Sequence, residues 1–259
     1  MTIDACVAQH IGDREEQQDR AGLYQHPRQP RIVLAVVADG MGGHTGGSLA
    51  AEQVTHTAKT NLEQFSPSSE SGEAMLEATL REAHLLIRGG RFINEQEPHS
   101  TGVMLLLQPR DDGLEAHWAH CGDSRLYHFR GSQPVARTTD HSYVEELLRA
   151  GTITTEQAAV HPQRNLVVTS LGGREPPLID CGRAERLLAG DSFILCSDGL
   201  WAYFGEAEMG AIVASFSARQ AAETLLKRAR ERCAGKGDNC TLVILKLVEV
   251  AKRTPPRPR

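Results

Sequence analysis

Residues 32–38 form a continuous apolar run, Ile-Val-Leu-Ala-Val-Val-Ala, which Asp39 and Gly40 follow at once. An apolar run of this length is typical of a β-strand that is buried on both of its faces. It therefore predicts a sheet in the interior of the fold, covered on each side. The other long apolar run, residues 103–107, is also of strand length, and neither run approaches the length of a membrane span.

The order of the expected elements separates two classes of fold. Apolar runs and alternation predict strands at residues 3–11, 31–39, 101–108, 114–120, 125–129, 178–184, 191–196 and 241–248. Helical spacing predicts helices around residues 49–62 and 75–87, from residue 140 onwards, and over residues 217–235. Residues 166–171 fit either kind of element. This order lacks the regular strand–helix alternation of a doubly wound parallel sheet. We therefore expect an α+β fold, a four-layer α-β-β-α sandwich of two mostly antiparallel sheets flanked by helices.

Short local signals mark the ends of several of these elements. A Ser or Thr followed three positions later by Glu or Gln is typical of the start of a helix. The sequence has three such pairs, Ser142 with Glu145, Thr154 with Gln157, and Ser217 with Gln220. Gly151 stands where a glycine commonly ends a helix. Asp112-Gly113, between two predicted strands, is a strong signal for a β-hairpin.

Composition disfavours several classes of function but does not discriminate between folds. The 259 residues are 40% hydrophobic and 24% charged, with 28 basic against 33 acidic residues and a formal net charge of −5. This balance gives no electrostatic reason to expect a nucleic-acid or membrane-surface partner. The six cysteines are scattered and form no C-x-x-C pair, which favours a reducing compartment over a disulfide framework or a zinc site. We expect a cytoplasmic monomer.

No internal repeat and no linker divides the sequence. One domain over residues 1–250 is therefore the simplest interpretation. Residues 251–259 are basic and rich in proline, and we expect them to form a disordered tail.

Aspartates recur at the ends of the predicted strands. The five are Asp19, Asp39, Asp123, Asp198 and Asp238. A carboxylate at the end of a buried strand is costly unless it is paired or coordinated. Clustered carboxylates also provide the oxygen ligands that hard cations such as Mg²⁺ and Mn²⁺ prefer. An Asp-Gly pair taken alone is most often a turn, so the whole set carries the argument and no single pair does.

These aspartates belong to an ordered series of short motifs. The series comprises Arg14 to Asp19, Ala38-Asp39-Gly40-Met41-Gly42-Gly43-His44, Ser100-Thr101-Gly102, Cys121-Gly122-Asp123-Ser124-Arg125, Asp140-His141-Ser142, His161-Pro162, Ser197-Asp198-Gly199-Leu200 and Gly237-Asp238-Asn239. It resembles the type 2C metal-dependent serine/threonine protein phosphatases, and most closely their bacterial single-domain branch. Each motif is short, but the series follows the family's order and covers nearly the whole chain, which makes the resemblance specific.

The resemblance implies hydrolysis of phosphoserine and phosphothreonine in proteins, in opposition to a cognate serine/threonine kinase. It implies that Asp39 is shared by two Mn²⁺ or Mg²⁺ ions, with the Gly40 carbonyl as a further ligand. Asp198 and Asp238 would complete this pair of metal sites. Asp19 would act through water molecules.

Two further roles follow from the same resemblance. Asp123 would hold a weaker third ion, and Arg14 would bind the substrate phosphate, for which the fork of a guanidinium is well suited. A water shared by two divalent ions loses a proton easily and can attack phosphorus. The reaction therefore needs no cysteine or serine nucleophile.

The sequence departs from the family pattern at two positions. Gln18 precedes Asp19 where the family often has glutamate, so this position offers no carboxylate. Met41 occupies the place of a histidine that is the candidate general acid in the eukaryotic branch. His44 is the nearest alternative proton donor, and a water on the metal is the other.

The segment from Asp140 to about residue 165 corresponds to the helical flap that the family carries beside its active site. Asp140, His141, Ser142 and His161 are its candidate residues. The segment is either an element that selects substrates or a surface insertion without that role.

Two other functions compete with this interpretation. The glycines after Asp39 follow a strand and precede a helix, as in a dinucleotide-binding loop. However, Thr45 stands where the third glycine should be, and Lys59 stands near the place of the ribose-binding acid. The second alternative is a non-catalytic relative that binds phosphoproteins, which would be expected to lack one of the metal aspartates.

Overall fold

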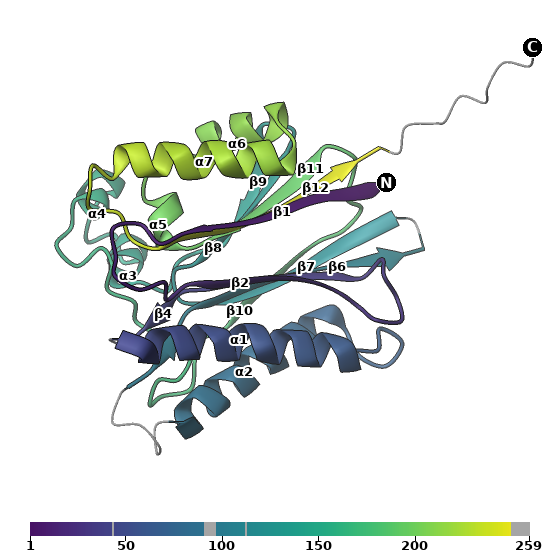
Figure 1. Cartoon of the computed structure of the whole chain (residues 1–259), viewed down its shortest axis with the longest axis horizontal. Coiled ribbons are helices and arrows are strands. Elements are labelled where there is room, and N and C mark those ends of the chain that lie inside the picture. Colours follow the sequence, from purple (N-terminus) through teal and green to yellow (C-terminus); the bar gives the residue numbers. More distant parts are fainter. Residues whose placement is uncertain (43, 91–96, 112, 250–259) are drawn as a thin grey trace, which may run out of the picture.

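Two five-stranded antiparallel sheets form the interior of the molecule (Figure 1). The computed structural model describes residues 1–42, 44–90, 97–111 and 113–249. The first sheet has the order β1 (Thr2–His10), β12 (Cys240–Val248), β11 (Asp191–Cys196), β8 (Arg125–Arg130), β9 (Gln133–Arg137). The second has the order β10 (Asp180–Ala184), β7 (Gly113–Cys121), β6 (Gly102–Arg110), β3 (Val33–Ala38), β2 (Arg20–Gln25). A small pair joins β4 (Gly40–Met41) to β5 (His99–Ser100).

Helices cover the outer face of each sheet. Helices α1 (His44–Gln64) and α2 (Gly72–Gly90) pack on the second sheet, and α6 (Glu206–Ser215) and α7 (Ala218–Arg232) pack on the first. The short α3 (Tyr143–Arg149), α4 (Thr155–Ala159) and α5 (Asp198–Trp201) gather at one end of the sandwich (Figure 1). The predicted four-layer α-β-β-α sandwich is confirmed. Within the described part of the chain, no helix is both long enough and apolar enough to span a membrane.

Three layers of buried side chains hold these four layers together. Strand β3 shows the principle, because successive side chains of a strand point to opposite faces. Leu34 and Val36 belong to the core beneath α1 and α2, whereas Val33, Ala35 and Val37 belong to the core between the sheets. This double burial explains why the run at residues 32–38 is continuously apolar.

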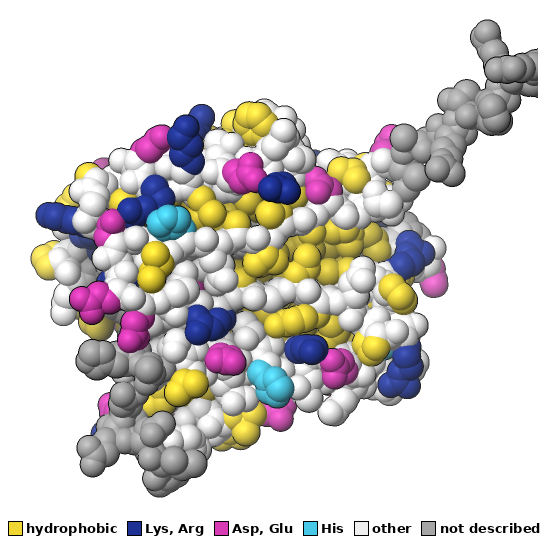
Figure 2. All heavy atoms as spheres, viewed as in Figure 1, with side chains coloured by type: hydrophobic (Ala, Val, Ile, Leu, Met, Phe, Trp, Pro, Cys, Tyr) yellow, Lys and Arg dark blue, Asp and Glu magenta, His cyan; other side chains and the backbone are white. Residues whose placement is uncertain are grey.

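The surface view agrees with a chain of small net charge. On the face drawn in Figure 2, acidic and basic side chains are interspersed, and a band of apolar side chains is visible between the layers. No large patch of one sign is visible on that face.

Local signals placed most elements correctly. Ser142, Thr154 and Ser217 are the N-caps of α3, α4 and α7, and the last two complete capping boxes. Arg110 pairs with Gly113 across the predicted hairpin, whose Asp112 lies outside the described residues. Strands β2 and β9 and helix α6 were not predicted. The ambiguous segment 166–171 forms only isolated bridges, and the predicted tail lies outside the described residues.

Candidate active site

Antiparallel pairing brings the strand ends that carry aspartates to the same end of the sandwich. Arg20 at the start of β2 pairs with Ala38 at the end of β3, which places Asp19 beside Asp39. In the other sheet, Cys196 at the end of β11 pairs with Leu242 near the start of β12. Asp198 and Asp238 border those two strand ends, and Asp123 lies in the turn from β7 to β8.

Close backbone packing explains the glycine after two of these aspartates. A Cβ atom on Gly40 would lie 2.0 Å from the carbonyl oxygen of Gly47. A Cβ atom on Gly199 would lie 2.0 Å from the carbonyl oxygen of Asn239. Neither glycine has a positive φ, in contrast to Gly113 in the hairpin. These two Asp-Gly pairs are therefore sites of close approach, and of the three glycines that follow an aspartate Gly113 alone has a positive φ.

The five carboxylates form a cluster whose negative charges act on one another. Asp19 and Asp123 are buried, at 1% and 5% of residue exposure. Burial raises the pKa of Asp19 to about 6. Burial, and then the charge of Asp140, raise the pKa of Asp123 to about 7. Burial and the charges of neighbouring aspartates also raise the pKa values of Asp39 and Asp198 well above the ordinary range. The folded chain thus holds several carboxylates at a site that disfavours their ionisation.

Few groups of the protein compensate this charge. Among the described residues, the cluster makes one side-chain ion pair, in which Arg14 Nη2 lies 2.5 Å from Asp238 Oδ2. Ser197 Oγ donates to Asp19 Oδ2 at 2.7 Å. Thr101 Oγ1 accepts the backbone N–H of Asp39 at 3.0 Å, which fixes the main chain at the end of β3. The donor set, carboxylate oxygens with uncompensated charge, fits a hard divalent cation.

Asn239 fixes the loop that carries Arg14. Its side-chain Nδ2 donates to the carbonyl oxygens of Ile11 and Glu16 at 2.8 and 2.9 Å. Its Oδ1 accepts the backbone N–H of Gln18 at 2.7 Å. The residue after Asp238 therefore holds the β1–β2 loop against the carboxylate cluster. Asn239 belongs to the Gly237-Asp238-Asn239 motif, but its position in the sequence did not indicate this role.

A cavity of about 600 Å³ opens over this cluster. Its lining residues are Asp13, Arg14, Glu15, Glu16, Gln18, Asp39, Gly40, Met41, Asp123, Asn165, Val167, Asp198, Asp238 and Asn239. Asp19 is covered and lies outside this lining. Asp13, Asn165 and Val167 were not predicted from the sequence, and Glu15 and Glu16 were part of the Arg14 to Asp19 motif without an assigned role, because no spacing signal tied them to the strand-end aspartates.

The flap residues lie at two levels. Asp140, His141 and Ser142 are buried at the base of the flap. His161 follows α4, where its Nδ1 accepts the backbone N–H of Gln163 at 3.1 Å. None of these four lines the cavity, whereas Asn165 and Val167 on the returning limb of the flap do. His44 begins α1, but its side chain lies outside the part that the structure describes.

One further group of possible metal ligands lies near the flap base. Ligand atoms of His120, His141 and Asp180 lie within 4.8 Å of one another. However, His141 Nδ1 accepts the N–H of Gly122 at 3.2 Å, so the neutral ring carries its proton on Nε2. That nitrogen is the one that faces Asp180, at 3.3 Å. A protonated nitrogen cannot ligate a metal, and we therefore assign His141 and Asp180 to a polar pair.

Comparisons with known proteins agree with this geometry. The family model described as protein phosphatase 2C matches residues 7–242. The protein phosphatase PhpP of Streptococcus pneumoniae is 33% identical over 248 residues, which cover 91% of this chain and 94% of PhpP.

Solved structures show the same likeness. The serine/threonine phosphatase of S. agalactiae has a TM-score of 0.84 at 28% identity and covers 96% of this chain and 100% of its own. The catalytic domain of the serine/threonine protein phosphatase PstP, in complex with two manganese ions, has a TM-score of 0.75 at 26% identity. That match covers 95% of this chain and 99% of the PstP domain. With its sequence, its fold and its strand-end aspartates all in agreement, the chain belongs to the protein phosphatase 2C family and is a serine/threonine protein phosphatase of the bacterial type.

Proposed function

We propose that this phosphatase hydrolyses phosphoserine and phosphothreonine in proteins with the help of two divalent cations, Mn²⁺ or Mg²⁺, held by Asp39, Asp198 and Asp238. The observation that supports the proposal is the cluster of five carboxylates, for which the described residues provide one side-chain ion pair, that of Arg14 with Asp238. When bound, such cations act as Lewis acids that lower the pKa of water and neutralise charge on phosphoryl oxygens. The residues around the cavity then bind, orient and enclose the substrate.

The environment of each aspartate suggests its role. Burial, and then the charges of the other four aspartates, raise the pKa of Asp39, which supports its assignment as the shared ligand, with the Gly40 carbonyl beside it. Asp198 and Asp238 line the cavity from the opposite sheet. Asp19 is covered and hydrogen-bonded to Ser197, so it would act through water molecules. Asp123 would hold a weaker third cation, because one carboxylate offers few protein ligands.

Arg14 is the candidate for binding the phosphate. Its side chain is 61% exposed and lines the cavity, and its bond to Asp238 uses only one terminal nitrogen. A guanidinium has five N–H donors, so the rest of the fork remains available for phosphoryl oxygens. Arg14 would thereby orient the phosphate against the carboxylate cluster. His44 stays a candidate for protonating the leaving oxygen.

The partners of the proposed reaction are phosphorylated proteins and a serine/threonine kinase of opposing activity. A monomeric state remains part of the proposal. A dinucleotide-binding loop is disfavoured, because it requires a parallel βαβ unit and β3 pairs antiparallel with both of its neighbours. A non-catalytic role is disfavoured, because all three predicted metal aspartates border the cavity.

The test is hydrolysis of p-nitrophenyl phosphate and of phosphoserine and phosphothreonine peptides, with Mn²⁺, with Mg²⁺ and in EDTA. We expect turnover with either cation and a fall to background in EDTA, with Mn²⁺ binding followed separately by calorimetry. Undiminished turnover in thoroughly chelated protein would contradict the proposal. Complete inhibition by a thiol reagent that leaves the fold intact would contradict it too. Binding of Mn²⁺ and phosphopeptide without hydrolysis would support the non-catalytic alternative.

A further inference from the structure

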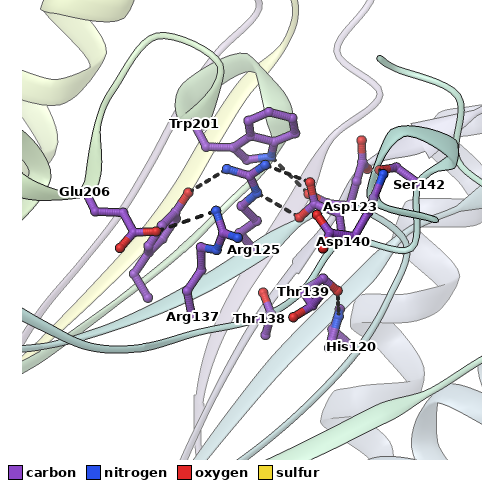
Figure 3. A network of polar contacts seen from close by, with 12 residues as sticks. His120, Asp123, Arg125, Arg137, Thr138, Thr139, Asp140, Ser142, Trp201 and Glu206 are labelled. Atoms are coloured by element: carbon purple, nitrogen blue, oxygen red, sulfur yellow. Dashed lines mark hydrogen bonds and ion pairs between the residues drawn. The ribbon is translucent and has the colours of Figure 1, made fainter. Parts of the chain in front are cut away.

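Arg125 lies at the centre of a polar network next to the carboxylate cluster (Figure 3). Its Nε and Nη2 each donate to an oxygen of Asp140 at 2.7 Å, which makes a bidentate pair. Its Nη1 donates to the hydroxyl of Tyr127 at 3.1 Å. The guanidinium carbon lies 3.6 Å from the ring centroid of Trp201. A planar cation that is held from one side and stacked on the other has little freedom to move.

Trp201 connects this arginine to the backbone of Asp123. Its indole Nε1 donates to the carbonyl oxygen of Asp123 at 2.9 Å (Figure 3). Trp201 is the last residue of α5, the short helix that begins with Asp198. One side chain therefore links two segments that each carry a candidate ligand. The same ring stacks on the guanidinium of Arg125.

The base of the flap lies against the same turn. The backbone N–H of His141 donates to the carbonyl oxygen of Gly122 at 3.0 Å. Behind it, Ser142 and Val167 form an isolated antiparallel bridge that closes the flap. Asp140 is thus the first flap residue, and its partner Arg125 lies two residues after Asp123.

The pair of Arg125 and Asp140 is largely buried, because the two side chains are 16% and 8% exposed. Loss of either partner would leave the other charge buried without compensation. The pair therefore holds the guanidinium in one position beside the Asp123 turn.

We propose that Arg125, held between Asp140 and Trp201, is a positioning residue that sets the orientation of Asp123 and thereby the affinity of its cation. This inference rests on the proposed function, in which Asp123 is the ligand of the weaker cation. It adds that the flap base and the Asp123 turn are joined through one guanidinium. A lysine at position 125 would keep the charge but lose both the bidentate fork and the flat stacking surface.

Tryptophan fluorescence provides a readout that is independent of turnover. The chain has two tryptophans, so Trp118→Phe leaves Trp201 as the single reporter next to Asp123. Titrating this protein with Mn²⁺, a paramagnetic quencher, should give a tighter and a weaker phase. Asp123→Asn should abolish the weaker phase. Arg125→Lys should raise the Mn²⁺ concentration of the weaker phase by about tenfold and leave the tighter phase unchanged, as expected for a group that orients a ligand.

Arg130→Lys is the matched control. Arg130 lies in the same strand and makes a bidentate pair with a buried aspartate, Asp191, at the other end of the sheet. It should change neither phase. An unchanged weaker phase in Arg125→Lys would overturn the inference. Loss of both phases would overturn it as well, because it would indicate a general structural role. A parent protein without any response to Mn²⁺ would instead contradict the proposed metal site itself.

A second variant covers the case in which Arg125→Lys does not fold. Trp201→Phe keeps an aromatic ring over Arg125 and removes only the N–H that holds the Asp123 carbonyl. Calorimetry with Mn²⁺ should then show the weaker class of sites weakened by about tenfold, with the tighter class intact. In the same variant the KM for p-nitrophenyl phosphate should hold, while the Mn²⁺ concentration for half-maximal turnover rises. Unchanged binding of both classes would overturn the inference.

Discussion

Strand β11 has a buried acidic residue at its start and a candidate metal ligand two residues after its end. Asp191 begins the strand, and its side chain is fully buried. Asp198 follows the strand at the opposite end of the sheet, where α5 starts. Both residues border the same apolar strand, Phe193 to Cys196, so their local sequence contexts are similar. Their surroundings in the fold differ completely.

Asp191 is satisfied by the protein alone. Arg130 donates to its two oxygens at 2.8 and 3.0 Å, and the backbone N–H of Leu188 donates to one of them at 2.8 Å. Burial raises the pKa of Asp191, but these hydrogen bonds outweigh burial, and the net pKa is lowered. At the Asp198 end, burial and like charges raise the pKa instead. Asp191 and Asp198 together indicate that a buried carboxylate is a candidate cation ligand only when the protein leaves its charge uncompensated.

The arginines at the two ends differ in the same way. Arg130 uses two nitrogens on one carboxylate, whereas Arg14 contacts Asp238 through one nitrogen. Asp191 is fully buried, and the side chain of Asp238 is 39% exposed. The first pair is therefore arranged for stability, and the second can exchange its partner for a phosphate at modest cost.

The largest expected effect on activity comes from a substitution in the carboxylate cluster. Asp39→Asn should lower kcat on the order of 10³-fold or more, or about 4 kcal/mol in activation free energy, because it removes the proposed shared ligand. In EDTA the same variant should be at least as stable as the wild type, because one of the repelling charges is gone. Steady-state kinetics and urea unfolding would measure both. A large loss of stability in EDTA would show that Asp39 stabilises the fold, as Asp191 does. The two ends of the sandwich would then not differ in the way described above.

At Asp191, in contrast, we expect a substitution to lower stability and to leave activity unchanged. Asp191→Asn should cost about 3 kcal/mol of folding stability at pH 7, because it breaks a buried ion pair, while kcat of the folded enzyme stays unchanged. The lowered pKa of Asp191 means that its contribution is complete above the unfolded value of 3.8 and is lost as pH falls through the folded value. The stability difference between wild type and variant should therefore narrow below about pH 4. A difference that is independent of pH would contradict this account.

A smaller effect is expected at the exchangeable arginine. Arg14→Ala should cost about 1.5–3 kcal/mol in kcat/KM by removing charge-assisted bonds to the phosphate. It should leave Mn²⁺ affinity nearly intact, because Arg14 is not a proposed ligand. Kinetics and calorimetry on one preparation would check both statements. Collapse of Mn²⁺ affinity with an unchanged KM would show that Arg14 acts on Asp238, as Arg130 acts on Asp191, and not on the substrate.

The interior strands and the helix caps could be predicted from the sequence. A strand segment buried on both faces favours a continuous apolar run, so β3 and the residues Phe193 to Cys196 of β11 are conspicuous. A cap depends on residues only three positions apart, so the starts of α4 and α7 were also identified. A helix cap is formed by residues a few positions apart in the chain. A buried strand shows as a continuous apolar run. Both signals can therefore be read from a short stretch of sequence.

The missed elements lack such signals. Strands β2 and β9 are at the edges of their sheets, and β9 contains Pro134 and is mostly exposed. Edge strands need no continuous apolar run, and proline is tolerated there. Helix α6 contains Gly210, where a Cβ atom would lie 2.3 Å from the carbonyl oxygen of Ser132. That glycine weakens the helix signal, and the close contact that requires it involves a residue distant in the sequence.

For the site, the sequence by itself determined which residues could take part. It provided five aspartates at strand ends, an arginine near the first of them, and the series of motifs that places the chain in its family. Only the tertiary structure decided that the five carboxylates gather at one end of the sandwich, where four of them line the cavity, while Asp191 is paired with Arg130 at the opposite end of its sheet. The partners Arg130, Asn239 and Trp201 were likewise assigned by packing. Charge compensation depends on which groups meet across the sheets, and these contacts join residues that are far apart in the chain.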